Sequence, residues 1–215
     1  MSNSKLILVL GDQLSWSNPA IAAADPQTDG IILAEVREEA SYVPHNRHKM
    51  VLIFSAMRHF AQALRDQGFT VYYTEIGAGL GSLEEACSAA LKQHPAKSVE
   101  VCSPGEHRLL AAMLQWSDRL GVPVNLLEDT RFLASNDDFT AWAAGRKQLR
   151  MEYFYREMRK RYDLLLDDQD PCGGQWNYDA DNRKGWRNQV PIPEREDVSP
   201  DAITQQVIDE VLEYF

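Results

Sequence analysis

Polar side chains follow directly after the first apolar run of the chain. The run Lys5–Leu10 ends in a short polar stretch made of Gly11, Asp12, Gln13, Leu14 and Ser15. A buried parallel strand that ends in this way places carboxylate, amide and hydroxyl groups at the ligand crevice of an open α/β sheet. An ordinary strand-to-loop turn, in which Asp12 and Ser15 cap the next segment, fits the same residues. Both interpretations stay open on these residues alone.

Short apolar runs alternate along the chain with longer segments of helical period. The strand-like runs are Lys5–Leu10, Gly30–Val36, Thr70–Glu75, Ser98–Cys102 and Pro123–Leu127. The predicted helices between them are Lys49–Gln67, Ser82–Gln93 and Glu106–Leu120. This βαβ series predicts an α/β fold: a Rossmann-like, doubly wound, parallel five-stranded sheet flanked by helices, with a long C-terminal linker and a terminal helix.

The predicted helices carry local signals of their own. An apolar stripe of period 3.6, typical of a face turned toward the core, consists of Ile53, Met57, Phe60 and Leu64. Ser82 with Glu85 three residues later predicts a capping box at the start of the second helix. Gly121 after Leu120 predicts the end of the third.

Length and composition indicate one soluble globular domain, or a domain with an extension. The chain has 215 residues, 44% of them hydrophobic. No apolar run approaches the roughly 20 residues that span a bilayer, and the first residues lack the pattern of a secretion signal, so we expect a cytoplasmic protein with no membrane partner. Cys87, Cys102 and Cys172 lie far apart, which predicts free thiols, two of them buried, rather than disulfides or a zinc site.

The net charge of −10 argues against uniform attraction to nucleic acid, but one segment is basic. Between Arg146 and Arg161 there are seven Lys or Arg residues against two Glu, and the predicted helix Gln148–Leu166 mixes these bases with aromatic residues. Such a mixture suits phosphate contacts and base stacking. A solvated helix face that pairs with Asp163, Asp167, Asp168 and Asp170 is the alternative.

The last part of the chain reads as a linker and a helix. Residues 167–200 are rich in Asp, Asn, Gly and Pro and show no helical or strand period. Ser199 and Pro200 then open a predicted helix over Asp201–Phe215. Its apolar residues, which repeat every four positions, are Ile203, Val207, Val211 and Phe215. An apolar helix at this place suggests either a shortened chain or packing on a partner that this chain lacks.

Several blocks of sequence, taken in order, resemble one family. They are Leu10–Leu14, Glu39–Val43, Phe54–Phe60, Trp142–Lys147, Met151–Met158 and Gly173–Arg183. The chain is similar over essentially its whole length to the N-terminal part of the bacterial deoxyribodipyrimidine photolyase-related proteins. These are the iron–sulfur bacterial cryptochromes and (6-4) photolyases.

The resemblance implies a domain plan and a set of cofactors. Residues 1–135 would form the α/β antenna domain, 136–166 a helical extension packed on it, 167–200 an interdomain loop, and 201–215 a helix leading toward a flavin domain. The antenna domain would hold a ribityllumazine, whereas FAD and an iron–sulfur cluster would lie in a C-terminal domain that this chain lacks. The three cysteines are therefore not expected to be cluster ligands, and the segment alone is not expected to repair DNA.

Carrying the antenna site over residue by residue gives a predicted set of cofactor-binding residues. They are Gly11, Asp12, Gln13, Leu14, Glu39, Ile53 and Phe54, with Glu35 as a further candidate that could instead pair with Arg37 or a helix terminus. A lumazine has a flat ring with amide-like edges and a polyhydroxylated tail, so its pocket needs apolar faces and a few polar groups. An antenna makes and breaks no bonds. No catalytic residue is therefore assigned, and no metal ligand.

A basic and aromatic stretch in the long loop is the predicted contact with UV-damaged DNA. Arg183 and Lys184 are the assigned DNA-binding residues, and Trp176, Trp186 and Arg187 lie near them in the sequence. His45 and His48, beside Arg47 and Lys49, fit either a phosphate contact or a solvated loop that leads into a helix. His59 has no carboxylate or cysteine at ligand spacing, which argues against a metal role.

Two other classes of function fit parts of the sequence. A free-standing sensor would bind the lumazine or another heterocycle and use the last helix to dock a protein. A Rossmann-like nucleotide-binding module would need phosphate recognition, but the first strand–helix turn lacks Gly-x-Gly-x-x-Gly and the chain has no P-loop lysine.

Overall fold

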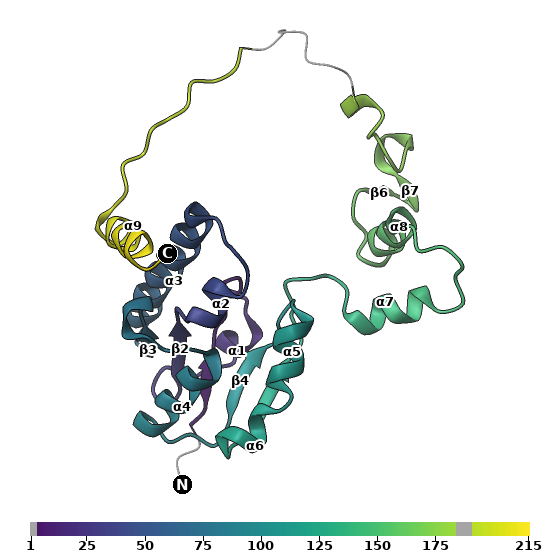
Figure 1. Ribbon diagram of the computed structural model, residues 1–215. Coiled ribbons are helices and arrows are strands. Elements are labelled where there is room, and N and C mark those ends of the chain that lie inside the picture. Colours follow the sequence, from purple (N-terminus) through teal and green to yellow (C-terminus); the bar gives the residue numbers. More distant parts are fainter. Residues whose placement is uncertain (1–3, 184–190) are drawn as a thin grey trace. The chain divides into compact units, whose positions relative to one another are not determined.

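The computed structural model describes residues 4–183 and 191–215, and the chain divides into two compact units. The first, which we call the α/β unit, comprises Met1–Arg131 and Ser199–Phe215. The second unit is Phe132–Val198. Figure 1 shows that the chain leaves the α/β unit after β5 and returns to it as the terminal helix α9. The first unit thus ends at Arg131, a few residues before the expected boundary at residue 135, and it includes the terminal helix.

One all-parallel sheet forms the centre of the α/β unit, as the βαβ pattern predicts. The strand order is β3-β2-β1-β4-β5. The strands are β1 Leu6–Leu8, β2 Gly30–Ala34, β3 Thr70–Thr74, β4 Val99–Cys102 and β5 Val124–Leu127. All five fall within the predicted runs and are shorter by one to three residues, which is the usual uncertainty of element ends.

Helices cover both faces of this sheet. The bounds in the α/β unit are α1 Pro19–Ala22, α2 Arg37–Ser41, α3 Arg47–Asp66, α4 Leu83–Gln93, α5 His107–Met113, α6 Trp116–Leu120 and α9 Ala202–Tyr214, with a 3-10 turn η1 at Ile76–Ala78. Ile7 and Ile31 face the side of α1, α3 and α9, while Leu6 and Leu8 face the side of α4, α5 and α6. The alternation of strand residues between two buried layers makes the sheet doubly wound.

Two local predictions for the α/β unit need correction. The helix expected over Glu106–Leu120 is broken by a tight turn in which the Gln115 N–H donates to the Ala112 carbonyl, 3.0 Å away. Ser82 does cap α4 by accepting from the Glu85 N–H. The Glu85 carboxylate, however, accepts from the Gly81 N–H at 2.8 Å, one residue earlier than a capping box requires.

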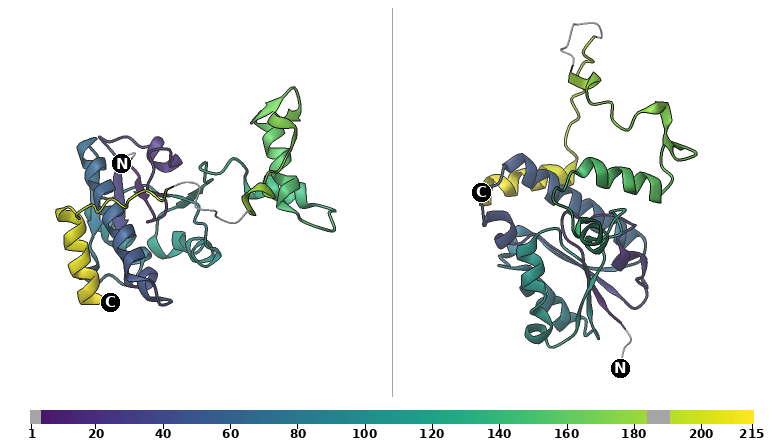
Figure 2. Two further views of the ribbon diagram at one scale, coloured as in Figure 1. Left: turned by 90° about the horizontal axis from the view of Figure 1, so that it is seen from above. Right: turned by 90° about the vertical axis from the view of Figure 1, so that its right-hand side faces the viewer.

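The terminal helix is covered within the α/β unit. Val207 and Val211 are 0% and 1% exposed and belong to the same core as the inner face of α3. Both views in Figure 2 show α9 lying along α3. The expectation that this apolar stripe awaits a missing partner is therefore wrong for its central residues.

The second unit contains two helices and a small hairpin. Their bounds are α7 Asn136–Ala143, α8 Met151–Arg161, β6 Leu166–Asp167 and β7 Asp170–Pro171, with 3-10 turns at Cys172–Gly174 and Asp181–Arg183. The helix α8 is shorter than the predicted Gln148–Leu166, because Asp163 and Leu165 adopt positive φ angles of 52° and 54° and end it. The hairpin was not predicted, because two-residue strands leave no period in the sequence.

Ion pairs of α8 in the described part of the chain run to Glu152 and Asp138 rather than to the acidic run after the helix. Arg156 pairs with Glu152 at 2.8 Å and Arg161 with Asp138 at 2.6 Å.

No helix among the described residues is long and apolar enough to cross a membrane. The prediction of free thiols is confirmed, with Cys87 and Cys102 buried and Cys172 partly exposed.

Candidate functional site

A cavity of about 340 Å³ lies in the α/β unit at the carboxyl ends of β1, β2 and β4. The chain builds the sheet outward from β1 to β3 and then crosses over to β4 on the other side of β1. Open α/β sheets bind ligands outside the strand ends at such a reversal of strand order. The topology therefore puts the cavity where this fold class has its binding site.

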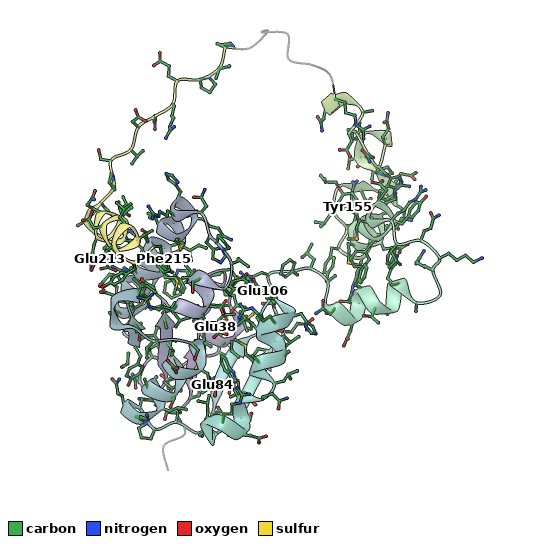
Figure 3. All side chains as sticks on the ribbon, viewed as in Figure 1. Glu38, Glu84, Glu106, Tyr155, Glu213 and Phe215 are labelled. Atoms are coloured by element: carbon green, nitrogen blue, oxygen red, sulfur yellow. The ribbon has the colours of Figure 1, made fainter. Side chains whose placement is uncertain are left out.

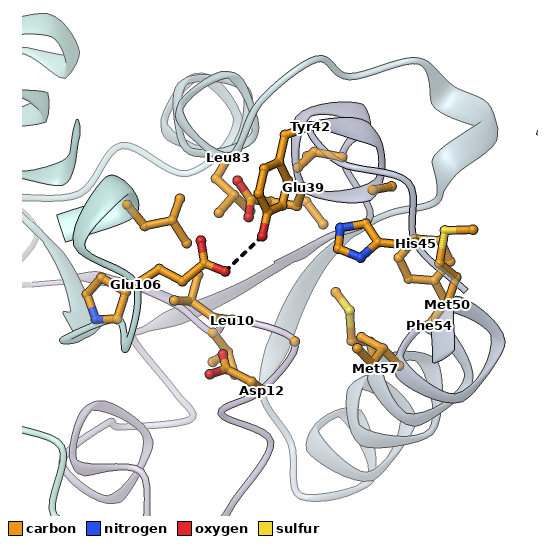
Figure 4. A pocket seen from close by; sticks show the side chains of 18 of the residues that line it. Leu10, Asp12, Glu39, Tyr42, His45, Met50, Phe54, Met57, Leu83 and Glu106 are labelled. Carbon is orange, nitrogen blue, oxygen red and sulfur yellow. Dashed lines mark hydrogen bonds between the residues drawn. The ribbon is translucent and has the colours of Figure 1, made fainter. Parts of the chain in front are cut away.

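Apolar side chains form most of the cavity wall. Those from the sheet edge and from α3 and its neighbours are Val9, Leu10, Ala34, Val36, Ala40, Met50, Ile53, Phe54, Met57, Leu83, Pro104 and Leu109. Gly11 allows α3 to approach the end of β1 closely, because a Cβ at this position would lie 3.0 Å from Ile53 Cγ2. Figure 4 shows Met50, Phe54 and Met57 projecting from α3, with Glu106 across the cavity. The wall suits the face of a flat ring.

A charged group closes one side of the cavity. Arg108 donates to Glu39 at 2.7 Å and to Glu106 at 3.2 Å, and its guanidinium lies 4.4 Å from the centre of the Tyr42 ring. Tyr42 Oη donates to Glu106 at 3.1 Å, drawn as a dashed line in Figure 4, and this hydrogen bond raises the pKa of Tyr42. The hydrogen bond to Glu39 is the main cause that raises the pKa of Arg108. This guanidinium thus stays charged and fixes two carboxylates of the cavity.

Two buried polar atoms of the cavity lining lack a hydrogen-bond partner. They are Glu39 Oε1 and His45 Nε2. More than nine in ten buried polar groups are hydrogen-bonded, so each unpaired atom calls for an explanation. His45 is held beside the Tyr42 ring, with ring centres 5.3 Å apart. One acceptor and one imidazole nitrogen are therefore free to bind polar edges of a ligand.

Comparison with known proteins assigns the chain to a family. Residues 7–215 match the family described as deoxyribodipyrimidine photo-lyase-related protein. The chain belongs to the deoxyribodipyrimidine photo-lyase-related family. It is 44% identical, over 214 residues and 99% of its length, to a (6-4) photolyase of Agrobacterium fabrum, of which it spans only 42%. It is also 23% identical, over 155 residues, to an uncharacterized protein of Acanthamoeba polyphaga mimivirus, covering 70% of this chain and 78% of that protein.

Five of the eight residues predicted to bind the antenna in this photolyase-related chain line the cavity. They are Gly11, Asp12, Glu39, Ile53 and Phe54. Gln13 is fully buried and donates from Nε2 to the carbonyls of Cys102, at 3.1 Å, and Ser103, at 3.2 Å. Leu14 packs against the core beneath α3. Gln13 thus joins the ends of β1 and β4, and its contact with a ligand stays a prediction.

Glu35 lies behind the cavity wall in a buried charged network. Its carboxylate is 0% exposed and accepts two hydrogen bonds of 2.8 Å from Arg58, one of 2.9 Å from the Ile76 N–H and one from the Tyr73 hydroxyl. Arg58 also donates to Glu210 of α9. The partner of Glu35 is therefore Arg58 and not the predicted Arg37. The Arg37 side chain lies over the Tyr214 ring instead. The four donors occupy this carboxylate, which leaves it a structural role.

The protonation states in this network follow from burial and pairing. Burial alone would lower the pKa of Arg58, but the hydrogen bonds to Glu35 and Glu210 raise it overall. Burial, together with the charge of Glu35, raises the pKa of Tyr73. The hydrogen bond from Arg58 lowers the pKa of Glu210. The network thus holds one guanidinium between two carboxylates.

Sequence reasoning missed the far side of the cavity in this family member. Tyr42, Glu106 and Arg108 were not candidates, and His45 was assigned to a phosphate contact or a solvated loop. The rule that led to Gly11 and Asp12, polar residues directly after a parallel strand, also applies to the residues after β4. Applied there, it would have pointed to Glu106.

The predicted DNA-binding residues lie in the second unit. Arg183 ends the last 3-10 turn and is exposed. Lys184, together with Trp186 and Arg187, lies outside the described residues. His59 Nε2 of α3 lies 2.9 Å from Oδ2 of Asp201, the N-cap residue of α9, which gives this histidine a place in helix packing.

Proposed function

We propose that the α/β unit binds a ribityllumazine as the light-harvesting chromophore of a photolyase-type flavoprotein. The observation that carries the proposal is the pair of unpartnered buried atoms, Glu39 Oε1 and His45 Nε2, in a largely apolar cavity at the crossover of the sheet. A lumazine offers an amide-like edge that can donate to a carboxylate and bond to an imidazole. Its ring face fits the wall that Ile53 and Phe54 supply.

The charges of the cavity favour a neutral heterocycle over a phosphate ligand. Asp12, Glu39 and Glu106 line it, against the single lysine Lys49. Arg108, the cation nearest to Glu39, is already bonded to two carboxylates. A phosphate group would meet more negative than positive charge. This supports an antenna pocket rather than the nucleotide-binding alternative.

The chain's contribution to light harvesting is to hold the chromophore. When bound, the lumazine supplies absorption of near-ultraviolet or blue light and passes the excitation on to a flavin. The apolar wall excludes water from the ring, while Glu39 and His45 fix its orientation in the plane. Asp12, at the exposed mouth, can accept from hydroxyl groups of the ribityl tail.

The whole protein would carry out light-driven repair of UV-damaged DNA, with blue-light sensing as the alternative. The Agrobacterium fabrum relative is a (6-4) photolyase, which supports repair, and it is much longer than this chain. FAD and an iron–sulfur cluster would belong to a further domain. The buried thiols of Cys87 and Cys102, whose pKa values burial raises to about 12 and about 11, are unsuited to hold a cluster. A protein that repairs DNA would act in the compartment that holds the DNA, which we propose is the cytoplasm.

A fluorescence titration of the purified chain with 6,7-dimethyl-8-ribityllumazine tests the antenna proposal. His45→Phe keeps the ring beside Tyr42 and removes the nitrogen, so it is expected to weaken binding about fivefold, the worth of one hydrogen bond near 1 kcal/mol. Glu39→Gln is expected to weaken it at least as much, because it also disturbs Arg108. His48→Phe makes the same chemical change at an exposed position outside the cavity and serves as the matched control.

Saturable binding that falls in both cavity variants and persists in the control would support the proposal. A folded parent chain that does not bind the lumazine, or equal losses in His45→Phe and His48→Phe, would contradict it.

A further inference from the structure

A second cavity, of about 380 Å³, lies within the second unit. Its lining comes from α8, from Leu165 just before the small hairpin and from the segment that follows the hairpin. None of the residues of the first cavity contribute to it. Three aromatic side chains face it, those of Tyr155, Trp176 and Tyr178. Tyr155 and Tyr178 are 47% and 46% exposed, and Figure 3 marks Tyr155 on α8. Their rings offer open faces on which a planar group can stack.

Cations gather around the Trp176 ring. The guanidinium carbons of Arg156 and Arg159 lie 5.5 Å and 5.1 Å from its centre, and Lys160 Nζ lies 5.6 Å from it. Arg156 is neutralised by Glu152, but Lys160 is exposed and carries no ion pair among the described residues. Three cations on one aromatic ring mark a place that attracts an anion.

Arg159 is the unusual member of this group. It is 6% exposed, and its guanidinium donates to the carbonyls of Leu164, at 3.0 Å, and Leu165. Within the described ranges, 4–183 and 191–215, no carboxylate pairs with it. Buried charges in proteins are normally paired with an opposite charge, because desolvation makes a lone ion costly. The cavity lining therefore contains a buried positive charge whose hydrogen bonds go to backbone carbonyls and not to the two carboxylates of the lining, Glu152 and Asp179.

Polar groups on the rim of the second cavity supply hydrogen-bond donors and acceptors. The amide of Gln175 and the carboxylate of Asp179 line the cavity beside the rings and offer a donor and acceptors. Asn177 is held in place, because its Nδ2 donates to Glu152 at 3.1 Å and its Oδ1 accepts from the Asp179 N–H at 2.7 Å. Stacking faces, edge-binding groups and free cations together match the parts of a nucleotide: base face, base edge and phosphate.

We propose that this cavity binds one nucleotide of a single-stranded nucleic acid. The base stacks on Trp176 between Tyr155 and Tyr178, and Arg159 with Lys160 takes the adjoining phosphate. Asp179 opposes the phosphate electrostatically, so it faces the base edge. The site belongs to the second unit and does not depend on the lumazine pocket. A nucleotide ligand also accounts for the basic and aromatic composition of α8.

Fluorescence polarisation with a fluorescein-labelled oligothymidylate, measured on the whole chain at low salt, tests this proposal. Trp176→Leu is expected to weaken binding about tenfold or more, since loss of one base stack has effects of this size. Lys160→Gln is expected to weaken binding and to reduce the slope of log Kd against log salt by about 0.7, the value of one phosphate contact on a single strand. Lys92→Gln, an exposed lysine in the last turn of α4, is the matched control.

The outcomes are distinguishable from simple misfolding and from the antenna proposal. Lys160 is exposed, so its substitution leaves the unit folded, and the far-ultraviolet circular dichroism spectrum of each variant checks this. Glu39→Gln is expected to leave oligothymidylate affinity unchanged. Absence of binding to the parent, equal loss in Lys92→Gln, or equal displacement by a polyglutamate peptide of matched charge would overturn the proposal. The last result would point to an acidic protein partner.

Discussion

Replacing Glu35 by glutamine is expected to destabilise the α/β unit by about 3–5 kcal/mol, the cost of leaving one member of a buried ion pair alone. The carboxylate is 0% exposed and accepts from Arg58 twice, from Tyr73 and from the Ile76 N–H. A glutamine side chain has one acceptor oxygen, and its NH₂ group would face donors. Arg58 would keep Glu210, which is 19% exposed, and the more distant Glu75, which is 4.0 Å away and 50% exposed.

Glu210→Gln is the matched control, because it makes the same chemical change on the same guanidinium from the partly exposed side. The buried Glu35–Arg58 pair remains, so the expected cost is about 1 kcal/mol or less, as for pairs near the surface. Comparing the two variants separates the effect of removing a buried carboxylate from the effect of removing one negative charge beside Arg58. Equal effects of the two substitutions would refute the reasoning.

Urea unfolding read by labelling of Cys87 measures the effect in the α/β unit alone. The thiol is 0% exposed, and burial raises its pKa to about 12, so it reacts only when the unit unfolds. Cys102→Ser and Cys172→Ser in every variant leave one reporter. With a slope of about 2 kcal/mol/M, Glu35→Gln is expected to lower the urea midpoint by about 1.5–2.5 M. A loss below about 1 kcal/mol would contradict the structural role assigned to Glu35.

Further predictions concern the pH dependence of stability, the tight packing around Gly30 and the packing of the terminal helix. Because the hydrogen bond from Arg58 lowers the pKa of Glu210, its contribution is present above the usual value of 4.5 and is lost as pH falls through the folded value. The difference in unfolding free energy between the parent and Glu210→Gln should therefore shrink in acid; a constant difference would argue against the ion pair. Gly30→Ala should cost about 1–3 kcal/mol in urea unfolding, because the new Cβ would lie 2.8 Å from Leu6 Cδ2. Val207→Ala should cost about 2 kcal/mol and speed hydrogen exchange in α9, since Val207 is 0% exposed; unchanged exchange would show that its packing contributes nothing.

The parallel five-stranded sheet and the edge of it that holds the candidate site were accessible from the sequence. Apolar runs of five to seven residues separated by amphipathic segments predict a doubly wound sheet, and strand ends rich in polar residues predict the edge at which a ligand binds. Asp12 and Glu39 were found in this way or by family resemblance, and both line the cavity. These signals are local along the chain, which is why a single sequence contains them.

The roles that sequence reasoning did not predict depend on contacts between distant residues. Glu35 meets Arg58, 23 positions away, and Arg58 meets Glu210, a further 152 positions away. Nothing in the residues next to Glu35 indicates whether its carboxylate turns toward a ligand or into the core. The early end of α8 likewise depends on the side chain of Arg159, which binds carbonyls beyond the helix. Such pairings are decided by tertiary packing.

The most direct test of the antenna site is ¹³C-methyl NMR of the methionines during a titration with 6,7-dimethyl-8-ribityllumazine. Met50 and Met57 line the cavity, whereas Met113 lies in the opposite core layer and Met158 in the second unit. A ring bound against α3 is expected to shift the methyl signals of Met50 and Met57 saturably and to leave those of Met113 and Met158 in place. Unchanged signals of Met50 and Met57 at saturating lumazine, or a shift confined to Met158, would contradict the account.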